Sequence, residues 1–310
     1  MTSKKIKQYR AAEDELFQFY NLERREHFIP IAPLGIQVRV QETGQGPPIL
    51  FIHGGPNAGS TWAELASMLP NFRCLLIDRP GCGLSEAPEG QMGSKKVLLH
   101  WITSTIDSVL DYFQHDEVAM VGSSFGGYWA LNYTLQRPER IHHLVLESCP
   151  ALVEGMVIPG FMKSLTYPVL RWLIPKLPTS KSYAIKIMKD IGHTYSVENG
   201  LLSDLFVEWY LSLSNHTDTM KHEVANINKI LTNGKMNPEY ILRDEDISKI
   251  TRPTLWLWGE DDPFGGVDIG RRLHSRMVDS EFVSFKNSGH LPWLDQPKEH
   301  AANIAAFVSQ

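Results

Sequence analysis

The sequence has few cysteines, little net charge and no long apolar run. Its three cysteines, Cys74, Cys82 and Cys149, lack the spacing of metal ligands, so we expect neither a disulfide scaffold nor a zinc module. With 30 basic and 35 acidic side chains, the net charge of −5 gives no positive field to gather nucleic acid. No stretch approaches the roughly 18 apolar residues of a membrane span, and no apolar run follows the basic N-terminus as in a secretory signal. We therefore expect a cytoplasmic protein without a nucleic-acid partner or a membrane span.

Short apolar runs alternate with helical patterns along the 310 residues. Residues 36–40 alternate apolar and polar side chains, as in a half-exposed strand. Further strands are indicated at 49–52, 74–77, 118–121, 144–146, 254–258 and 282–285. Amphipathic or apolar helical patterns occur at 61–68, 96–113 and 297–308. Most of the strand runs are continuously apolar, which is typical of a parallel sheet covered by helices on both faces. The sequence therefore predicts an α/β fold with a mostly parallel central sheet.

This alternation stops after Pro150. From residue 151 to 247 we expect no strand, because apolar residues recur at helical spacing between scattered prolines. The strand pattern returns near residue 254. We therefore predict a core made of residues 1–150 and 248–310, with residues 151–247 as a helical insertion.

The clearest chemical signal is the segment Gly122-Ser123-Ser124-Phe125-Gly126, which fits the pattern G-x-S-x-G. An apolar strand precedes it and a helical pattern follows it. A sharp turn between strand and helix would lift the hydroxyl of Ser124 out at the carboxyl edge of the sheet. Ser124 is therefore the candidate nucleophile.

A serine hydroxyl is a weak nucleophile at neutral pH unless a base removes its proton. His290, in a loop just after the strand at 282–285, is the candidate base. Candidates for the carboxylate that would hold this histidine follow the strand at 254–258, at Glu260, Asp261 and Asp262, and Glu147 is a competitor at the end of an earlier strand. The order serine, acid, histidine is the one expected for this type of fold.

Acyl transfer also needs backbone N–H donors aimed at the oxyanion. The amide of Phe125, next to the nucleophile, is one candidate. The strand at 49–52 opens into His53-Gly54-Gly55-Pro56, and we assign the second donor to Gly55 because proline has no N–H. His53 itself is expected to be structural.

The chain resembles the α/β-hydrolase superfamily, in particular its capped serine-hydrolase branch, which includes esterases, C–C bond hydrolases, perhydrolases and aminopeptidases. The matching segments are 53–56, 78–85, 122–127, 258–263 and 288–290. In the family the acid usually lies three residues after the glycine of the fourth segment, and this selects Asp262 over Asp261. The resemblance also implies that the insertion is a lid over the active site.

This resemblance implies a cofactor-free and metal-free hydrolase acting on a small molecule, with a carboxylic ester as the first choice. Alternatives are C–C bond cleavage, amide or iminopeptide hydrolysis, acyl transfer, and a non-catalytic ligand-binding role. Relatives that open epoxides or remove halides have aspartate where this chain has Ser124. Iminopeptidases usually have glycine where it has Asn57, and Gln-Arg-Gly where it has Arg79-Pro80-Gly81. The sequence leaves the oligomeric state open, with a homodimer as one option.

His216, His222 and Glu223 lie close together in the sequence of the insertion. Their spacing does not place two histidines one helical turn apart, as a metal site on a helix requires. We expect them on the solvated face of a lid helix.

Overall fold

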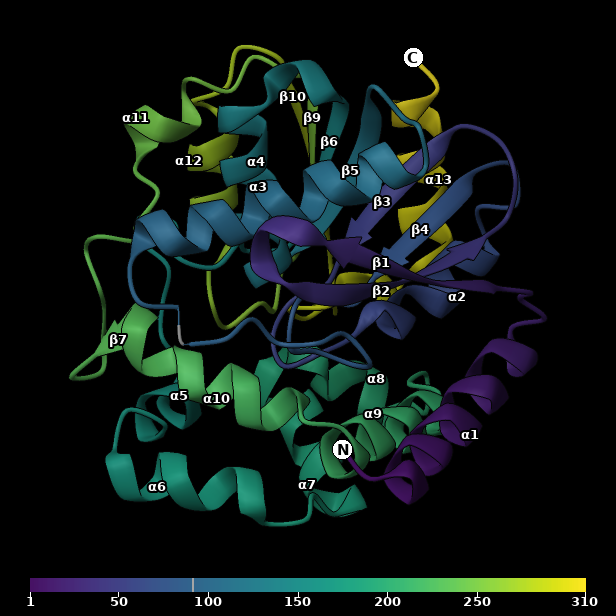
Figure 1. Cartoon of the computed structure of the whole chain (residues 1–310). Helices are drawn as coiled ribbons and strands as arrows, with labels where there is room; N and C mark the ends of the chain where they lie inside the picture. The colour runs from purple at the N-terminus through teal and green to yellow at the C-terminus, as the bar shows by residue number, and fades with distance from the viewer. Residues whose placement is uncertain (91) are drawn as a thin grey trace.

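A computed structural model describes residues 1–90 and 92–310, and over this part of the chain eight strands form one sheet in the order β1-β2-β4-β3-β5-β6-β9-β10 (Figure 1). Their bounds are β1 Arg25–Ile31, β2 Ile36–Thr43, β3 Pro48–Ile52, β4 Arg73–Ile77, β5 Val118–Ser123, β6 Ile141–Glu147, β9 Thr254–Gly259 and β10 Ser280–Phe285. β2 pairs antiparallel with β1 and β4, and the other neighbours are parallel. The prediction of an α/β fold with a mostly parallel sheet is confirmed.

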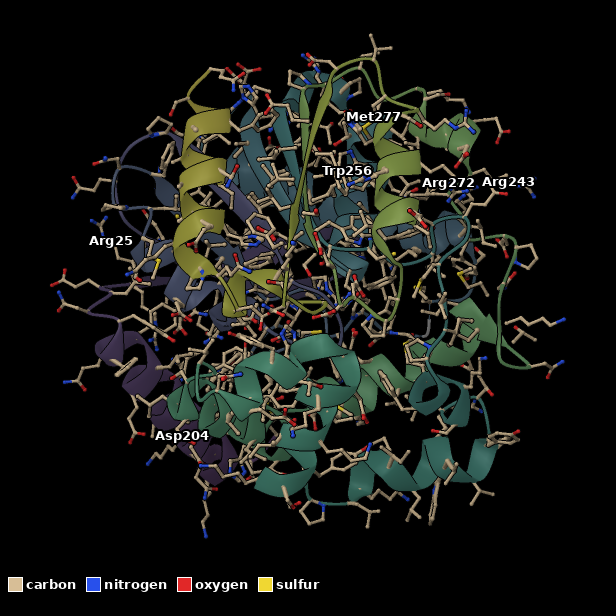
Figure 2. The ribbon with its side chains drawn as sticks, turned by 180° about the vertical axis from the view of Figure 1, so that it is seen from behind. Arg25, Asp204, Arg243, Trp256, Arg272 and Met277 are labelled. Atoms are coloured by element: carbon tan, nitrogen blue, oxygen red, sulfur yellow. The ribbon has the colours of Figure 1, made fainter. Side chains whose placement is uncertain are left out.

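Helices cover both faces of this sheet. They include α2 Ala63–Ser67, α3 Lys95–Tyr112, α4 Phe125–Gln136, α12 Val267–His274 and α13 Pro297–Val308. Figure 1 shows α3 and α4 in front of the sheet, and α13 comes to the front when the molecule is turned in Figure 2. The side chain of Ser94 caps α3 by accepting a hydrogen bond from the N–H of Val97 at 3.3 Å. Among the described residues, no helix is both long and apolar enough to cross a membrane.

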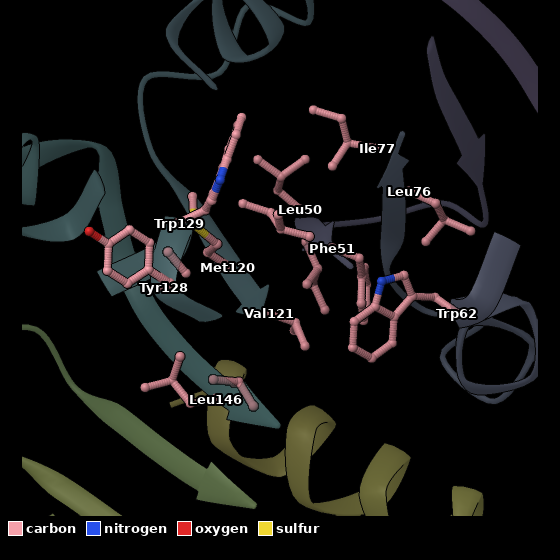
Figure 3. Packing of buried hydrophobic residues seen from close by; sticks show 14 of the residues in the cluster. Leu50, Phe51, Trp62, Leu76, Ile77, Met120, Val121, Tyr128, Trp129 and Leu146 are labelled. Carbon is pink, nitrogen blue, oxygen red and sulfur yellow. The ribbon is translucent and has the colours of Figure 1, made fainter. Parts of the chain in front are cut away.

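The central strands are buried on both faces, which explains their continuous apolar sequence. Leu50, Phe51, Leu76 and Val121 are inaccessible to solvent. Figure 3 shows Tyr128 and Trp129 of α4 to one side of these strands and Trp62 to the other. The sheet holds the carboxyl ends of β3, β5, β9 and β10 in place, and the loops with the candidate site residues leave from these four ends.

The sequence pattern did not indicate the first helix and strand. Helix α1 (Ser3–Phe19) is mostly polar and packs against α9 (Asp204–His216) of the insertion, as the lower part of Figure 1 shows. The buried Glu13 of α1 pairs with Arg39 of β2 at 2.7 Å, and Arg39 pairs in turn with Asp78 at 2.7 Å. All three side chains are fully buried, and burial of such charges is tolerated because they are mutually paired.

The segment between β6 and β9 is mainly helical. It contains α5 Gly160–Ser164, α6 Pro168–Leu173, α7 Lys181–Met188, α8 Thr194–Glu198, α9 Asp204–His216, α10 Thr219–Ile230 and α11 Asp244–Ile247. Figure 1 shows α5 to α10 gathered below the sheet, whereas α11 lies at the upper left, near α12.

The expectation that residues 151–247 contain no strand is wrong in one detail. The short strands β7 (Leu231–Thr232) and β8 (Lys235–Met236) form a hairpin. Its turn is Asn233-Gly234, whose φ angles of 51° and 70° suit a tight hairpin turn. An Asn-Gly pair is a recognisable turn signal, but the adjoining strands are too short to show a period of two.

Candidate active site

Ser124 lies at the sharp turn between β5 and α4, the geometry that its motif predicts. Its φ of 53° and ψ of −118° are unusual for a residue with a side chain. The turn is possible because residue 126 is glycine: a Cβ there would overlap the carbonyl oxygen of Ile52 on the neighbouring strand. Ser124 lines a cavity between the sheet edge and the insertion. The hydroxyl of Ser124 therefore lies at the cavity wall, on a backbone whose conformation is constrained.

His290 and Asp262 are in direct contact. The Nδ1 atom of His290 lies 2.9 Å from Oδ2 of Asp262, and the side chains are 6% and 0% exposed. The carboxylate also accepts hydrogen bonds from the backbone amides of Cys149 at 3.0 Å and Phe264 at 2.8 Å. These bonds fix the carboxylate, which in turn orients the imidazole. Nε2 of His290 has no hydrogen-bond partner among the described residues, and His290 lines the same cavity as Ser124.

The competing carboxylates lie elsewhere. Glu147 pairs with His300 of α13 at 2.8 Å, and both side chains are fully buried in the core. Asp261 is exposed, on the turn before Asp262. The structure therefore brings Asp262, and not Glu147, to the Nδ1 atom of His290.

Phe125 and Gly55 supply backbone amides beside the same cavity. Phe125 is the first residue of α4, so its N–H has no partner within the helix and lies at the positive end of the helix dipole. The carbonyl of Gly54 accepts hydrogen bonds from Nη2 of Arg79 at 3.0 Å and from Nδ1 of His53 at 2.6 Å. In a trans peptide the N–H points opposite to the C=O, so the N–H of Gly55 points away from Arg79.

Arg79 is a residue whose part in the site the sequence analysis missed. Its Nε also donates to the carbonyl of His53 at 2.9 Å, and its backbone N–H donates to Nε2 of His53 at 3.0 Å. Burial and the neighbouring guanidinium hold the pKa of His53 well below its usual range, so the ring is neutral and can accept this bond. Arg79 thus fixes the orientation of both peptide units that lead into Gly55.

The expectation that Glu223 lies on the solvated face of a lid helix is wrong. Glu223 lies on α10, and its Oε2 atom is 3.1 Å from Nη2 of Arg79. Only 17% of the Glu223 side chain is exposed. A Cβ on Gly55 would overlap this carboxylate. The physical reason is the buried guanidinium of Arg79, which needs a counter-charge. Among the described residues, no group of three or more His, Cys, Asp or Glu side chains could hold a metal ion.

The cavity itself has a volume of about 170 Å³ and a mostly apolar wall. The core contributes the candidate site residues, and the insertion contributes side chains such as Met188, Ile191 and Ile227. A second hollow of about 390 Å³ is lined mainly by the insertion and shares Phe161 and Tyr210 with the first. Over the described residues, the wall contains Glu223 and His290 but no lysine or arginine.

Comparison with known proteins identifies the family of this fold. The family model described as the alpha/beta hydrolase fold matches residues 47–297. The chain belongs to the α/β-hydrolase family. It is 23% identical over 273 residues to a 2-hydroxy-6-oxo-6-phenylhexa-2,4-dienoate hydrolase of Burkholderia cepacia, covering 85% of this chain and 89% of the relative.

Solved α/β-hydrolase structures share the whole architecture. A carboxylesterase from Bacillus subtilis superposes with a TM-score of 0.75 over 98% of both chains, at 19% identity. The naproxen esterase of the same organism gives a TM-score of 0.74 over 99% of both chains, at 18% identity. At these identities the likeness establishes the fold, and the reaction has to be argued from the site.

Proposed function

We propose that this α/β hydrolase is a serine hydrolase that works through an acyl-enzyme. Ser124 attacks a carbonyl carbon while Nε2 of His290 takes its proton, and Asp262 holds the imidazole and stabilises its charged form. The observation that carries the proposal is the 2.9 Å contact between His290 and Asp262 at the wall of the cavity that Ser124 lines. His290 then protonates the leaving group and activates water to release the acyl product.

The oxyanion of the tetrahedral intermediate would be bound by the amides of Phe125 and Gly55. Each such donor is typically worth about a hundred- to a thousandfold in rate. The carboxylate of Glu223 close to Gly55 would oppose a second negative charge, but Arg79 pairs with it at 3.1 Å and offsets its field. Arg79 therefore has a positioning role: it orients the peptide unit whose N–H, that of Gly55, would bind the oxyanion.

For the substrate we propose a neutral carboxylic ester with a small or medium apolar acyl group. The wall is mostly apolar, and its volume of about 170 Å³ is below the roughly 300–1,000 Å³ of drug-sized ligand sites. The adjoining hollow of about 390 Å³ gives room for a longer chain. Over the described residues the wall carries no lysine or arginine, and its carboxylate, Glu223, is already paired with Arg79, so an anionic substrate would lose its hydration without gaining a counter-charge.

C–C bond hydrolysis is the second candidate, because several curated relatives are named as hydrolases of 2-hydroxy-6-oxo dienoates. These names denote carboxylates. The same serine and histidine could serve that reaction, but the described part of the cavity wall offers no free positive charge to a carboxylate, and this favours the neutral ester.

We further propose that residues 151–247 act as a lid that shapes the acyl site, while residues 1–150 and 248–310 form the catalytic core. Support comes from the apolar side chains that the insertion contributes to the cavity wall. Shortening the lid is expected to change the preferred acyl length more than the rate on the smallest ester.

The test is to treat the purified protein with a fluorophosphonate, locate the label by mass spectrometry, and assay a series of p-nitrophenyl esters beside 2-hydroxy-6-oxo-6-phenylhexa-2,4-dienoate. We expect one label per chain at Ser124, none in Ser124→Ala, and faster turnover of the esters. Absence of labelling at Ser124 refutes the nucleophile assignment. Labelling with faster turnover of the dienoate refutes the substrate assignment alone.

A further inference from the structure

A second histidine–aspartate pair lies directly behind the loop that carries His290. Nδ1 of His193 lies 2.8 Å from Oδ2 of Asp295, and the two side chains are 0% and 1% exposed. His193 belongs to the insertion, between α7 and α8, whereas Asp295 lies just before α13. Neither residue lines the cavity among the described residues, so the pair does not take part in the proposed chemistry directly.

The pair holds the backbone of the His290 loop. The N–H of Gly289 donates to Oδ2 of Asp295 at 2.9 Å, and the N–H of Leu291 donates to Nε2 of His193 at 3.2 Å. Between them, the N–H of His290 donates to the carbonyl of Ile191 at 2.9 Å. Three consecutive backbone amides around the candidate base are thus bound to the pair or to the segment that carries His193.

The hydrogen bonds of His193 fix its tautomer. Nε2 accepts from the N–H of Leu291, so the ring proton sits on Nδ1 and is donated to Asp295. Asp295 also accepts from the hydroxyl of Ser196. Every polar atom of the pair therefore has a partner, and the loss of one would leave a buried donor or acceptor unsatisfied at a cost of about 1–3 kcal/mol in general.

The same segment touches the loop that carries the acid. Gly192, with φ 99°, packs so closely that a Cβ there would overlap the carbonyl oxygen of Asp261 and crowd the Cα of Gly289. Asp261 immediately precedes Asp262 in the sequence. The backbone at 191–193 is therefore in contact with the loops on both sides of the Asp262–His290 hydrogen bond.

We propose that His193 and Asp295 are positioning residues, which hold the imidazole of His290 in line between Asp262 and Ser124. The inference rests on the proposed serine-hydrolase function. It assigns to the insertion a part in aligning the base, in addition to shaping the acyl site. Misplacement of a reacting group by about 1 Å can cost on the order of a hundredfold in rate. The three hydrogen bonds donated by the backbone N–H groups of this loop therefore bear directly on turnover.

The test compares His193→Leu, which removes both hydrogen bonds, with His193→Gln, whose amide offers an acceptor and a donor. Ester turnover is measured per active site titrated with fluorophosphonate, together with KM and the melting temperature. We expect His193→Leu to lower kcat by about 10- to 100-fold with KM within about twofold, and His193→Gln to recover most of the loss. An unchanged kcat in His193→Leu overturns the proposal.

The matched control is His300→Leu. It breaks another fully buried histidine–carboxylate pair, in which Nδ1 of His300 lies 2.8 Å from the carboxylate of Glu147. We expect it to lower the melting temperature comparably but to leave kcat per titrated site within about threefold. An equal loss of kcat in His300→Leu would mean that general loosening explains the effect, and it would refute positioning.

If His193→Leu does not fold, Asp295→Asn tests the same inference. Three donors, from His193, Ser196 and Gly289, face the Asp295 carboxylate, and an amide offers one oxygen to them. We expect the same fall in kcat at little change in KM, and a normal kcat overturns the proposal. Absence of wild-type labelling at Ser124 refutes the proposed function and this inference together, whereas normal labelling with unaffected variants refutes positioning alone.

Discussion

Replacement of Asp262 by asparagine is expected to lower kcat, because it disrupts the contact between Asp262 and His290. In Asp262→Asn, one carboxylate oxygen is replaced by an NH2 group of nearly the same size. If the NH2 occupies the Oδ2 position, it faces Nδ1 of His290 and the N–H of Cys149, 2.9 and 3.0 Å away in the wild type. Nδ1 must then become an acceptor, so the ring proton moves to Nε2, where it prevents the ring from taking the proton of Ser124.

The opposite orientation of the amide is also unfavourable. An NH2 group at the Oδ1 position faces the N–H of Phe264, which donates to Oδ1 at 2.8 Å in the wild type. A buried donor left unsatisfied costs about 1–3 kcal/mol, and the charge that stabilises the imidazolium is lost in either orientation. In a triad enzyme of another fold the same substitution lowers kcat by about 10⁴. We therefore expect a fall of about 10³- to 10⁴-fold, equivalent to about 4–5.5 kcal/mol of transition-state stabilisation.

The assay is ester hydrolysis by purified wild type and variants, with kcat normalised to correctly folded protein. Asp261→Asn, on the exposed turn, and Glu147→Gln, paired with His300, are the matched controls. Both are expected to keep kcat within about tenfold of wild type. A kcat for Asp262→Asn within fivefold of wild type, or a larger loss in Glu147→Gln, would refute the assignment of the acid.

Three other perturbations follow from the structure. Gly126→Ala is expected to lower the free energy of unfolding by about 1–3 kcal/mol, because its Cβ would overlap the backbone of β3; urea denaturation measures this, and an unchanged midpoint would contradict it. Arg79→Met, which removes one of the two hydrogen bonds to the carbonyl of Gly54, is expected to lower kcat for esters by about 10- to 100-fold, and an unchanged kcat would contradict the orienting role. Burial alone would raise the pKa of Glu13, but Arg39 lowers it to about 2, below its unfolded value near 4.5. Glu13 therefore contributes stability above about pH 4.5 that is lost as the pH falls towards 2, and unfolding free energies of Glu13→Gln should fall less steeply than those of wild type over this range.

The sequence was informative wherever the deciding residues are neighbours along the chain. The apolar runs of β3, β5 and β9 mark buried strands because strands covered on both faces have no polar side to alternate with. The turn at Ser124 could be predicted because its strain and its glycines lie within five residues. His290 and Asp262 could be proposed because both follow strands that end at one edge of a parallel sheet.

Other features depend on residues far apart in the chain, and no local pattern signals them. Arg79 and Glu223 are 144 residues apart, and His193 and Asp295 are 102 apart, yet each pair is in contact. Glu223 looked like a solvated residue on an amphipathic helix because the sequence does not show which part of the core that helix covers. The buried face of helix α1 likewise becomes apparent only in the folded chain, where the helix packs against α9 and Glu13 pairs with Arg39.

The local sequence thus determined the central strands, the strained turn and the candidate nucleophile, because backbone preference and side-chain periodicity act over a few residues. Only the tertiary structure decided which carboxylate meets His290, which charges pair inside the molecule, and which segments hold the loops of the site. Those outcomes depend on the packing of one element against another, since a buried charge or amide is stabilised by whichever partner the folded chain brings to it.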